Sequence, residues 1–153
     1  MIPVRHALGS YVTARRMGRP GLPRARFEAW QDRQLSRWLA RDLPRVAAYD
    51  RAPEHLTDLP VTDKATLMAD FAAYNTHGIT AEAVRAAIAR DCRIGNLTVG
   101  QSTGTSGNRG YFVISDAERF RWLGAILAKA IPDLVWRRPR VAIMLPQSTP
   151  LYD

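Results

Sequence analysis

Cysteine is almost absent from this chain of 153 residues, and no apolar run is long enough to cross a membrane. The single cysteine, Cys92, excludes an intrachain disulfide and any zinc site built on clustered cysteines. It suits a reducing compartment, so we expect a cytoplasmic protein without a secretory signal or a membrane partner. Glycine and proline number only 10 each, which excludes a low-complexity chain and predicts a folded domain.

Acidic residues are also few: 14, against 22 lysines and arginines, which gives a net charge of +8. Residues 1–51 carry +7, residues 52–92 carry −3 and residues 93–153 carry +4. A basic chain raises the alternative of a nucleic-acid partner. Because the excess is concentrated in the N-terminal third, we interpret it as the solvated faces of helices and expect no nucleic-acid partner.

Residues 1–92 are predicted to form a helical N-terminal region. Residues 24–41 have apolar side chains at helical spacing, and their two tryptophans, Trp30 and Trp38, are expected core anchors. Thr62 and Thr80 are expected to cap two further helices. The first 23 residues lack such a pattern and predict an irregular entry segment.

The sequence pattern of residues 93–153 differs from that of the preceding region and predicts the start of an α/β subdomain. Residues 111–114 and residues 140–145 read as short apolar strands with a helix between them. The order strand, helix, strand predicts a parallel layer. The predicted fold class is therefore α/β, in which a helical region precedes the first part of a larger parallel domain that is incomplete here.

The helix between these strands has a strong start signal. Ser115 and Glu118 form a capping box, and the helix is expected to run to residue 130. Its predicted core-facing stripe consists of Trp122, Leu123, Ile126, Leu127 and Ala130.

A loop at residues 100–110 contains four glycines and four hydroxyl residues, with no aliphatic side chain. Backbone N–H groups and hydroxyls in such number suit a polyphosphate, and Arg109 adds a fixed positive charge. The loop matches neither the Walker A pattern nor the dinucleotide fingerprint. Composition alone leaves open a phosphate site or a mobile surface turn.

The order of residues in the loop is more specific. Ser102-Thr103-Gly104-Thr105-Ser106-Gly107 resembles the phosphate-binding motif of the adenylate-forming superfamily, which includes acyl-CoA synthetases, luciferases and peptide-synthetase adenylation domains. Within it the chain resembles the phenylacetate–CoA ligase branch, in a clade related to synthetases that adenylylate a deazaflavin coenzyme. The resemblance is carried by Ala29-Trp30-Gln31, Leu59-Pro60-Val61-Thr62-Asp63-Lys64, Met68-Ala69-Asp70-Phe71, Asn75-Thr76-His77-Gly78-Ile79, Thr98 to Gly110, Ser115-Asp116, Glu118-Arg119 and Arg140-Val141-Ala142.

This resemblance implies an ATP-dependent ligase or synthetase that uses Mg²⁺. A carboxylate or a phenol-type hydroxyl would attack the α-phosphorus of ATP, giving an adenylate and pyrophosphate, and coenzyme A is a candidate later acceptor. The implied ATP phosphate contacts are hydroxyls of Ser102, Thr103, Thr105 and Ser106, close backbone approach at Gly104 and Gly107, and the charge of Arg109. No metal ligand from the protein is implied.

Two departures from the family pattern matter. The motif commonly ends Gly-x-Pro-Lys, whereas this chain has Gly107-Asn108-Arg109-Gly110, so the usual lysine is missing and Arg109 is the candidate substitute. The later family motifs have no counterpart before Asp153. We therefore expect the chain to correspond to the N-terminal part of such an enzyme, with catalytic residues beyond Asp153, and to be inactive alone.

Two alternatives stay open at this point. Gly107 to Gly110 is a G-x-x-G sequence with a basic member, as in KH nucleic-acid-binding domains, although a KH loop joins two helices. A non-catalytic remnant would retain the fold without the reaction. Neither the acceptor substrate nor the oligomeric state is defined by this sequence.

Overall fold

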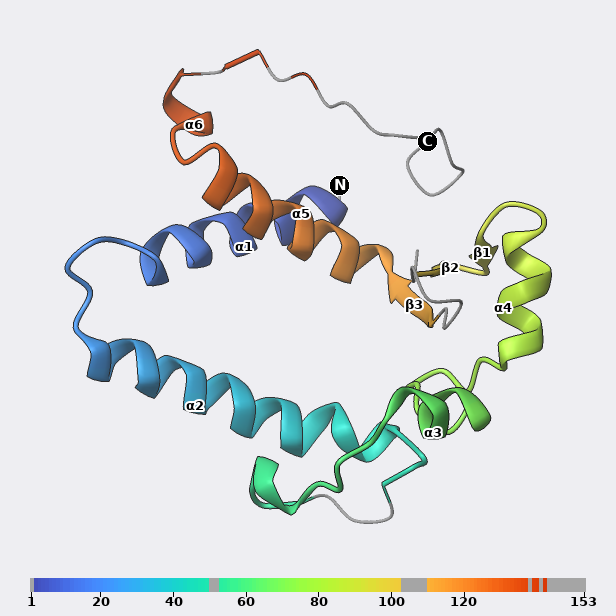
Figure 1. Cartoon of the computed structure of the whole chain (residues 1–153). Helices are drawn as coiled ribbons and strands as arrows, with labels where there is room; N and C mark the ends of the chain where they lie inside the picture. The colour runs from blue at the N-terminus through green and yellow to red at the C-terminus, as the bar shows by residue number, and fades with distance from the viewer. Residues whose placement is uncertain (1, 50–52, 103–109, 138, 141, 143–153) are drawn as a thin grey trace. The chain divides into compact units, whose positions relative to one another are not determined.

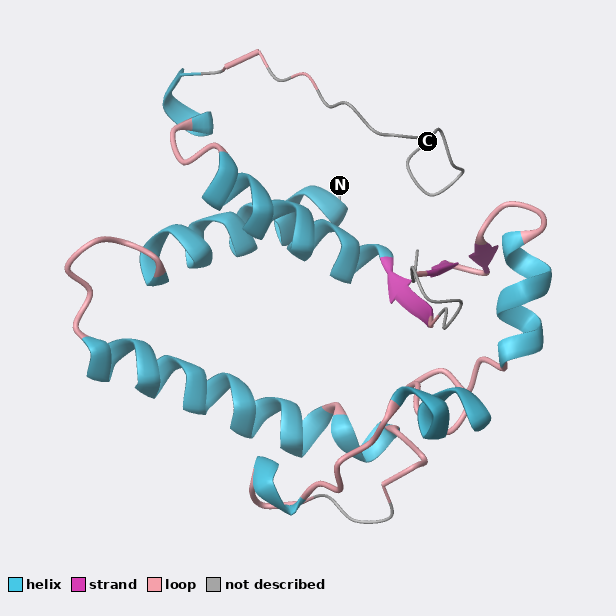
Figure 2. Cartoon of the chain, viewed as in Figure 1, coloured by secondary structure: helices cyan, strands magenta, loops and turns pink. Residues whose placement is uncertain are grey.

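The computed structural model describes residues 2–49, 53–102, 110–137, 139–140 and 142. Helices make up most of the residues that the structure describes, and the strands among these residues are confined to one short stretch (Figure 2). In chain order the elements are α1 (Ile2–Met17), α2 (Arg24–Arg41), 3₁₀ turns at Leu43–Arg45 and Leu56–Asp58, α3 (Lys64–Ala69), α4 (Ala81–Ile88), β1 (Arg93–Ile94), β2 (Leu97–Gln101), β3 (Tyr111–Ser115), α5 (Asp116–Ala130) and α6 (Leu134–Arg137).

Contacts divide the chain into two compact units. One contains residues 1–23, 96–98 and 114–153, and the other contains residues 24–95 and 99–113. The predicted division into residues 1–92 and 93–153 remains a prediction.

In the first unit, α1 lies along α5 (Figure 1). Tyr11 of α1 is buried, and its hydroxyl donates a hydrogen bond of 2.8 Å to the carbonyl oxygen of Pro132. The prediction of an irregular segment over the first 23 residues was therefore wrong. Local signals missed this helix because it has no acidic residue in its first turn, and its stabilisation comes from packing against a distant helix.

Helix α5 begins as predicted but buries a different face. The Ser115 hydroxyl accepts from the Glu118 N–H at 3.3 Å, and the Glu118 carboxylate accepts from the Ser115 N–H at 2.8 Å, which confirms the capping box. The buried residues are Gly124 and Ala128, whereas Trp122 of the predicted apolar stripe is 63% exposed. Small side chains were favoured here because they allow the backbones of α1 and α5 to approach closely.

The core of the second unit is formed by buried Phe71, Val84, Ala87 and Val99. Leu67 and Met68 of α3 and Tyr111 and Val113 of β3 pack against this cluster. Helix α2 has the predicted bounds, but Leu39 is its buried residue. Trp38 is 40% exposed, so its prediction as a core anchor was wrong. Its ring lies on the outer side of α2 because Leu39, the next residue along the helix, takes the inward position.

The N-cap of α3 is Asp63 rather than the predicted Thr62. The Asp63 carboxylate accepts a hydrogen bond of 2.7 Å from the Thr66 N–H, and this bond lowers the pKa of Asp63. A carboxylate is a stronger acceptor than a hydroxyl at this position, and the Thr62 hydroxyl points back to the Pro60 carbonyl instead. Thr80 caps α4 as predicted.

The three strands form one antiparallel sheet in the order β1-β2-β3. The expectation of a parallel layer is therefore not met by the described strands. The physical reason is the short connection between β2 and β3, since a parallel pair needs a long crossover, usually a helix. Of the strand predicted at residues 140–145, Arg140 and Ala142 belong to no helix or strand, and the remainder lies outside the described residues.

Asn75 links the end of α3 to the start of α4. Its side-chain NH₂ donates to the carbonyls of Phe71 (2.7 Å) and Ile79 (2.9 Å), and its side-chain oxygen accepts from the N–H groups of His77 (3.2 Å) and Ile79 (3.0 Å). Asn75→Asp removes both donors, so we expect the free energy of unfolding to fall by about 1–3 kcal/mol in urea denaturation. The exposed control Asn96→Asp is expected to change it by less than about 0.5 kcal/mol. Equal effects of the two variants would contradict this role of Asn75.

Candidate functional site

The described ends of the glycine- and hydroxyl-rich loop are joined by a pair of hydrogen bonds. The Ser102 N–H donates to the Gly110 carbonyl at 2.7 Å, and the Gly110 N–H donates to the Ser102 hydroxyl oxygen at 2.9 Å. The loop therefore starts and ends at one place, where β2 leaves the sheet and β3 enters it. The other predicted phosphate contacts, Thr103, Gly104, Thr105, Ser106, Gly107 and Arg109, lie outside the described residues.

Ser102 is the described member of the predicted phosphate contacts. Its side chain is exposed, and its oxygen accepts the Gly110 N–H. A hydroxyl group has one proton to donate in addition to its acceptor lone pairs. Ser102 can thus hold the base of the loop closed and still donate a hydrogen bond to an anion.

The exit of the loop is anchored to the core by Tyr111. Its ring packs edge-on against Phe71, with centroids 5.9 Å apart. The Arg85 guanidinium lies 3.5 Å from the Tyr111 hydroxyl, and this contact raises the pKa of Arg85. Arg85 also forms an ion pair of 2.7 Å with Glu82. These contacts give the loop a fixed exit.

The entry of the loop depends on a glycine. A Cβ atom on Gly100 would collide with the ring of Phe112, lying 2.9 Å from its Cε1 atom. The ring of Phe112 in β3 therefore covers Gly100 in β2, and no larger residue fits at this position without moving the ring. Entry and exit of the loop are both packed against aromatic side chains.

Lys64 is a cation at the base of the loop that the sequence pattern did not identify. It is the first residue of α3, is half-buried, and its Nζ atom lies 3.6 Å from the position that a Cβ atom on Gly110 would occupy. Lys64 lies far from the loop in sequence, so spacing gave no signal of this proximity.

Other reactive side chains of the described residues do not form a second site. Cys92 is buried, as expected for a small apolar residue, and it adopts a positive φ of 56°. His77 is exposed, and its backbone N–H donates to Asn75. Within the described ranges no three His, Cys, Asp or Glu residues gather closely enough to hold a metal ion.

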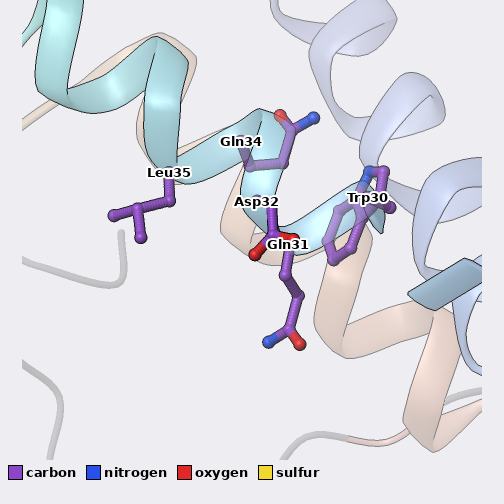
Figure 3. A pocket seen from close by; sticks show the side chains of 5 residues that line it. All are labelled: Trp30, Gln31, Asp32, Gln34 and Leu35. Carbon is purple, nitrogen blue, oxygen red and sulfur yellow. The ribbon is translucent and has the colours of Figure 1, made fainter. Parts of the chain in front are cut away.

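A hollow on the surface of α2 is lined by Trp30, Gln31, Asp32, Gln34 and Leu35. Figure 3 shows that these side chains come from a single helix and spread apart. Polar groups from different elements do not converge there, unlike the usual arrangement in a ligand site. We therefore assign no function to this hollow.

Comparisons with known proteins leave the function open. No family model matches the chain, and no curated protein or solved structure matches it. Among the residues that the structure describes, no helix has the length and apolar character needed to cross a membrane.

Proposed function

We propose that this chain forms the phosphate-binding part of a cytoplasmic, ATP-dependent adenylate-forming ligase. The reaction joins a carboxylate or phenol-type hydroxyl to the α-phosphorus of ATP and releases pyrophosphate. Coenzyme A is a candidate acceptor in a following step. We also propose that the enzyme has a parallel α/β layer in addition to the described antiparallel sheet.

The observation that carries this proposal is the loop at residues 100–110. Its motif, Ser102 to Gly107, resembles that of the adenylate-forming superfamily. The described ends support it, because Ser102 and Gly110 close the loop with two hydrogen bonds. Polyphosphate binding requires several N–H and hydroxyl donors at one place, and the composition of residues 100–110 supplies such donors.

The donor groups at the base of the loop fit an anion. Ser102 has a hydroxyl proton to donate, and Lys64 supplies a positive charge nearby. We assign Mg²⁺ to the triphosphate itself, where it would neutralise charge on the departing pyrophosphate. The residues of the loop then have a positioning role: they hold the β- and γ-phosphates so that the leaving group is in line with the attacking oxygen.

Calorimetric titration of the chain with Mg·ATP tests the proposal. We expect saturable binding with one site, and a higher melting temperature at saturating ATP. AMP, which lacks the β- and γ-phosphates, is expected to bind much more weakly. Absence of ATP binding by the folded chain would overturn the proposal.

The nucleic-acid alternative is disfavoured by one structural feature. In a KH domain the G-x-x-G loop joins two helices, whereas this loop follows β2 and precedes β3. Oligonucleotide binding that weakens steeply with salt, without any response to ATP, would instead favour that alternative. ATP binding without adenylation by any longer form of the protein would indicate a non-catalytic remnant.

Arg109 is the predicted cation of the loop. We expect Arg109→Ala to weaken ATP binding by about 1–3 kcal/mol, the loss of one charge-assisted contact. Arg121→Ala, which removes an exposed arginine from α5, serves as the matched control and is expected to leave the affinity unchanged. Calorimetry at constant ionic strength measures both. Equal affinities for the Arg109 variant and the wild type would make Arg109 a surface residue.

A further inference from the structure

Helix α1 carries exposed apolar side chains on a face where a surface helix is normally polar. Val4, Leu8 and Val12 are all exposed, and their spacing of four residues places them along one side of the helix. A different side of α1 packs on α5, since the backbone of Ala7 adjoins Gly124 there. Val4, Leu8 and Val12 therefore form a second apolar side of the helix, which we call the α1 stripe.

The α1 stripe leads into a hollow between α1 and α6. The hollow has a volume of about 350 Å³, and its apolar lining consists of Leu8, Tyr11, Val12, Pro132 and Trp136. The hydrogen bond from the Tyr11 hydroxyl to the Pro132 carbonyl oxygen joins the two sides of this hollow. Trp136 of α6 is 84% exposed, so its ring is available to a partner. Exposed apolar surface of this kind is typical of an interaction site.

Two arginines, Arg15 and Arg16, line the same hollow. Both are exposed, and neither forms an ion pair with a residue that the structure describes. The acidic residue of the adjoining turn, Asp133, pairs instead with Arg137 at 3.0 Å. Residues 1–23 contain four arginines and no Asp or Glu, so α1 has no negative charge of its own to balance them. Charge complementarity therefore calls for an occupant that carries negative charge next to an apolar group.

The shape of this surface favours a helix over a small molecule or a bilayer. Val4 and Val12 lie about 12 Å apart along the axis of α1, so a small molecule in the hollow leaves the start of the stripe uncovered. A bilayer presents a flat surface that does not fill a hollow, whereas one large side chain of a docked helix does. An amphipathic helix has apolar side chains at intervals of three and four residues, which match the spacing of the stripe.

We propose that the α1 stripe and the adjoining hollow dock an acidic amphipathic helix of a partner protein. Apolar side chains of the partner lie along the stripe, and a large one enters the hollow against Trp136. Carboxylates next to this large residue pair with Arg15 and Arg16 through charge-assisted hydrogen bonds. This inference goes beyond the proposed function, because it involves neither ATP nor the loop at residues 100–110.

A display library of amphipathic helices tests the chemistry of the partner. The apolar positions of the library are fixed, the charged positions are randomised, and selection is made on the whole immobilised chain. We expect the enriched peptides to carry Asp and Glu close to one large apolar residue, and the basic members to be depleted. Enrichment of basic peptides, or none above the starting library, would overturn the proposal.

Titration with an enriched acidic peptide, followed by fluorescence anisotropy, locates the site. Trp136→Ala is expected to weaken binding by about tenfold or more. Arg15→Glu combined with Arg16→Glu is expected to do the same, and to bind a version of the peptide in which lysines replace the acids. Trp122→Ala and Arg121→Glu alter exposed residues of α5 that do not line the hollow, and are expected to change affinity by less than about twofold.

Two further measurements distinguish other occupants. Binding of the chain to phosphatidylserine vesicles that Trp136→Ala removes, without peptide binding, would indicate a membrane surface and overturn the proposal. Self-association that Trp136→Ala removes and that excludes the peptide would indicate a second copy and overturn it as well. So would equal effects of Trp136→Ala and Trp122→Ala on peptide affinity. The melting temperature of each variant checks its fold, and the arginine variant decides if Trp136→Ala is unfolded.

Discussion

Gly124→Ala is expected to lower the free energy of unfolding by about 3 kcal/mol or more, because the added methyl group has no space. Its Cβ atom would collide with the carbonyl oxygen of Ala7 and lie 2.8 Å from the carbonyl carbon and 2.9 Å from Cα of the same residue. All of these are backbone atoms, which cannot turn aside as the end of a side chain can. Helices α1 and α5 must therefore separate along this contact.

The control for Gly124→Ala is the same substitution at Gly9 of α1. A Cβ atom on Gly9 meets nothing within 4 Å. Alanine in a helix interior is favoured over glycine, so Gly9→Ala is expected to raise the free energy of unfolding by about 0.5–1 kcal/mol. Urea denaturation measures both variants. Changes of the same sign at the two glycines would contradict the close contact between α1 and α5.

Gly107→Val is expected to abolish ATP binding, a loss of at least about a hundredfold in affinity, while the chain remains folded. In the proposed phosphate loop this glycine allows the backbone to approach the phosphate oxygens, and a valine side chain would occupy the space of the ligand. Calorimetry with Mg·ATP measures the loss, and the melting temperature without nucleotide checks the fold.

The matched control places valine at Gly9, where the space is open, and is expected to leave ATP affinity unchanged. If Gly107→Val is folded and binds ATP as tightly as the wild type, residues 102–107 do not form a phosphate-binding loop. If both variants lose ATP binding together with their thermal unfolding transition, the valine substitutions have prevented folding. Gly107→Ala, which adds only a methyl group, then tests the same position.

Local signals predicted the elements whose ends are defined by their own side chains. The capping box of Ser115 and Glu118 and the cap at Thr80 involve groups a few residues apart, so they are visible in the sequence. Helix α1 and the buried face of α5 are instead determined by the packing of these two helices against each other, and residues far apart in the sequence make that contact. The apolar stripe around Trp122 was the reasonable choice for a core, but the contact is made through Gly124 because close backbone approach outweighs side-chain size there.

The candidate site likewise contains one part that the sequence predicted and another part that it did not. The glycine- and hydroxyl-rich loop was visible in the sequence because its residues are consecutive, and its role in phosphate binding remains a prediction. Lys64 was not recognisable, since its proximity to Gly110 arises from the packing of α3 and β3 on one core. The antiparallel pairing was not predicted because no strand was predicted at residues 97–101; once β2 is present, its short connection to β3 requires antiparallel pairing.

The hydrogen bond from Tyr11 to Pro132 joins residues that are 121 positions apart in the chain. Closing a loop of this length has an entropic cost that must be met before the contact forms, and this cost slows its formation. During synthesis at about 5–20 residues per second, α1 leaves the ribosome on the order of 10 s before the segment that covers Tyr11. Helix α1 is therefore made well before the residue that accepts the Tyr11 hydrogen bond, and over that interval the Tyr11 face of α1 is open to chaperones.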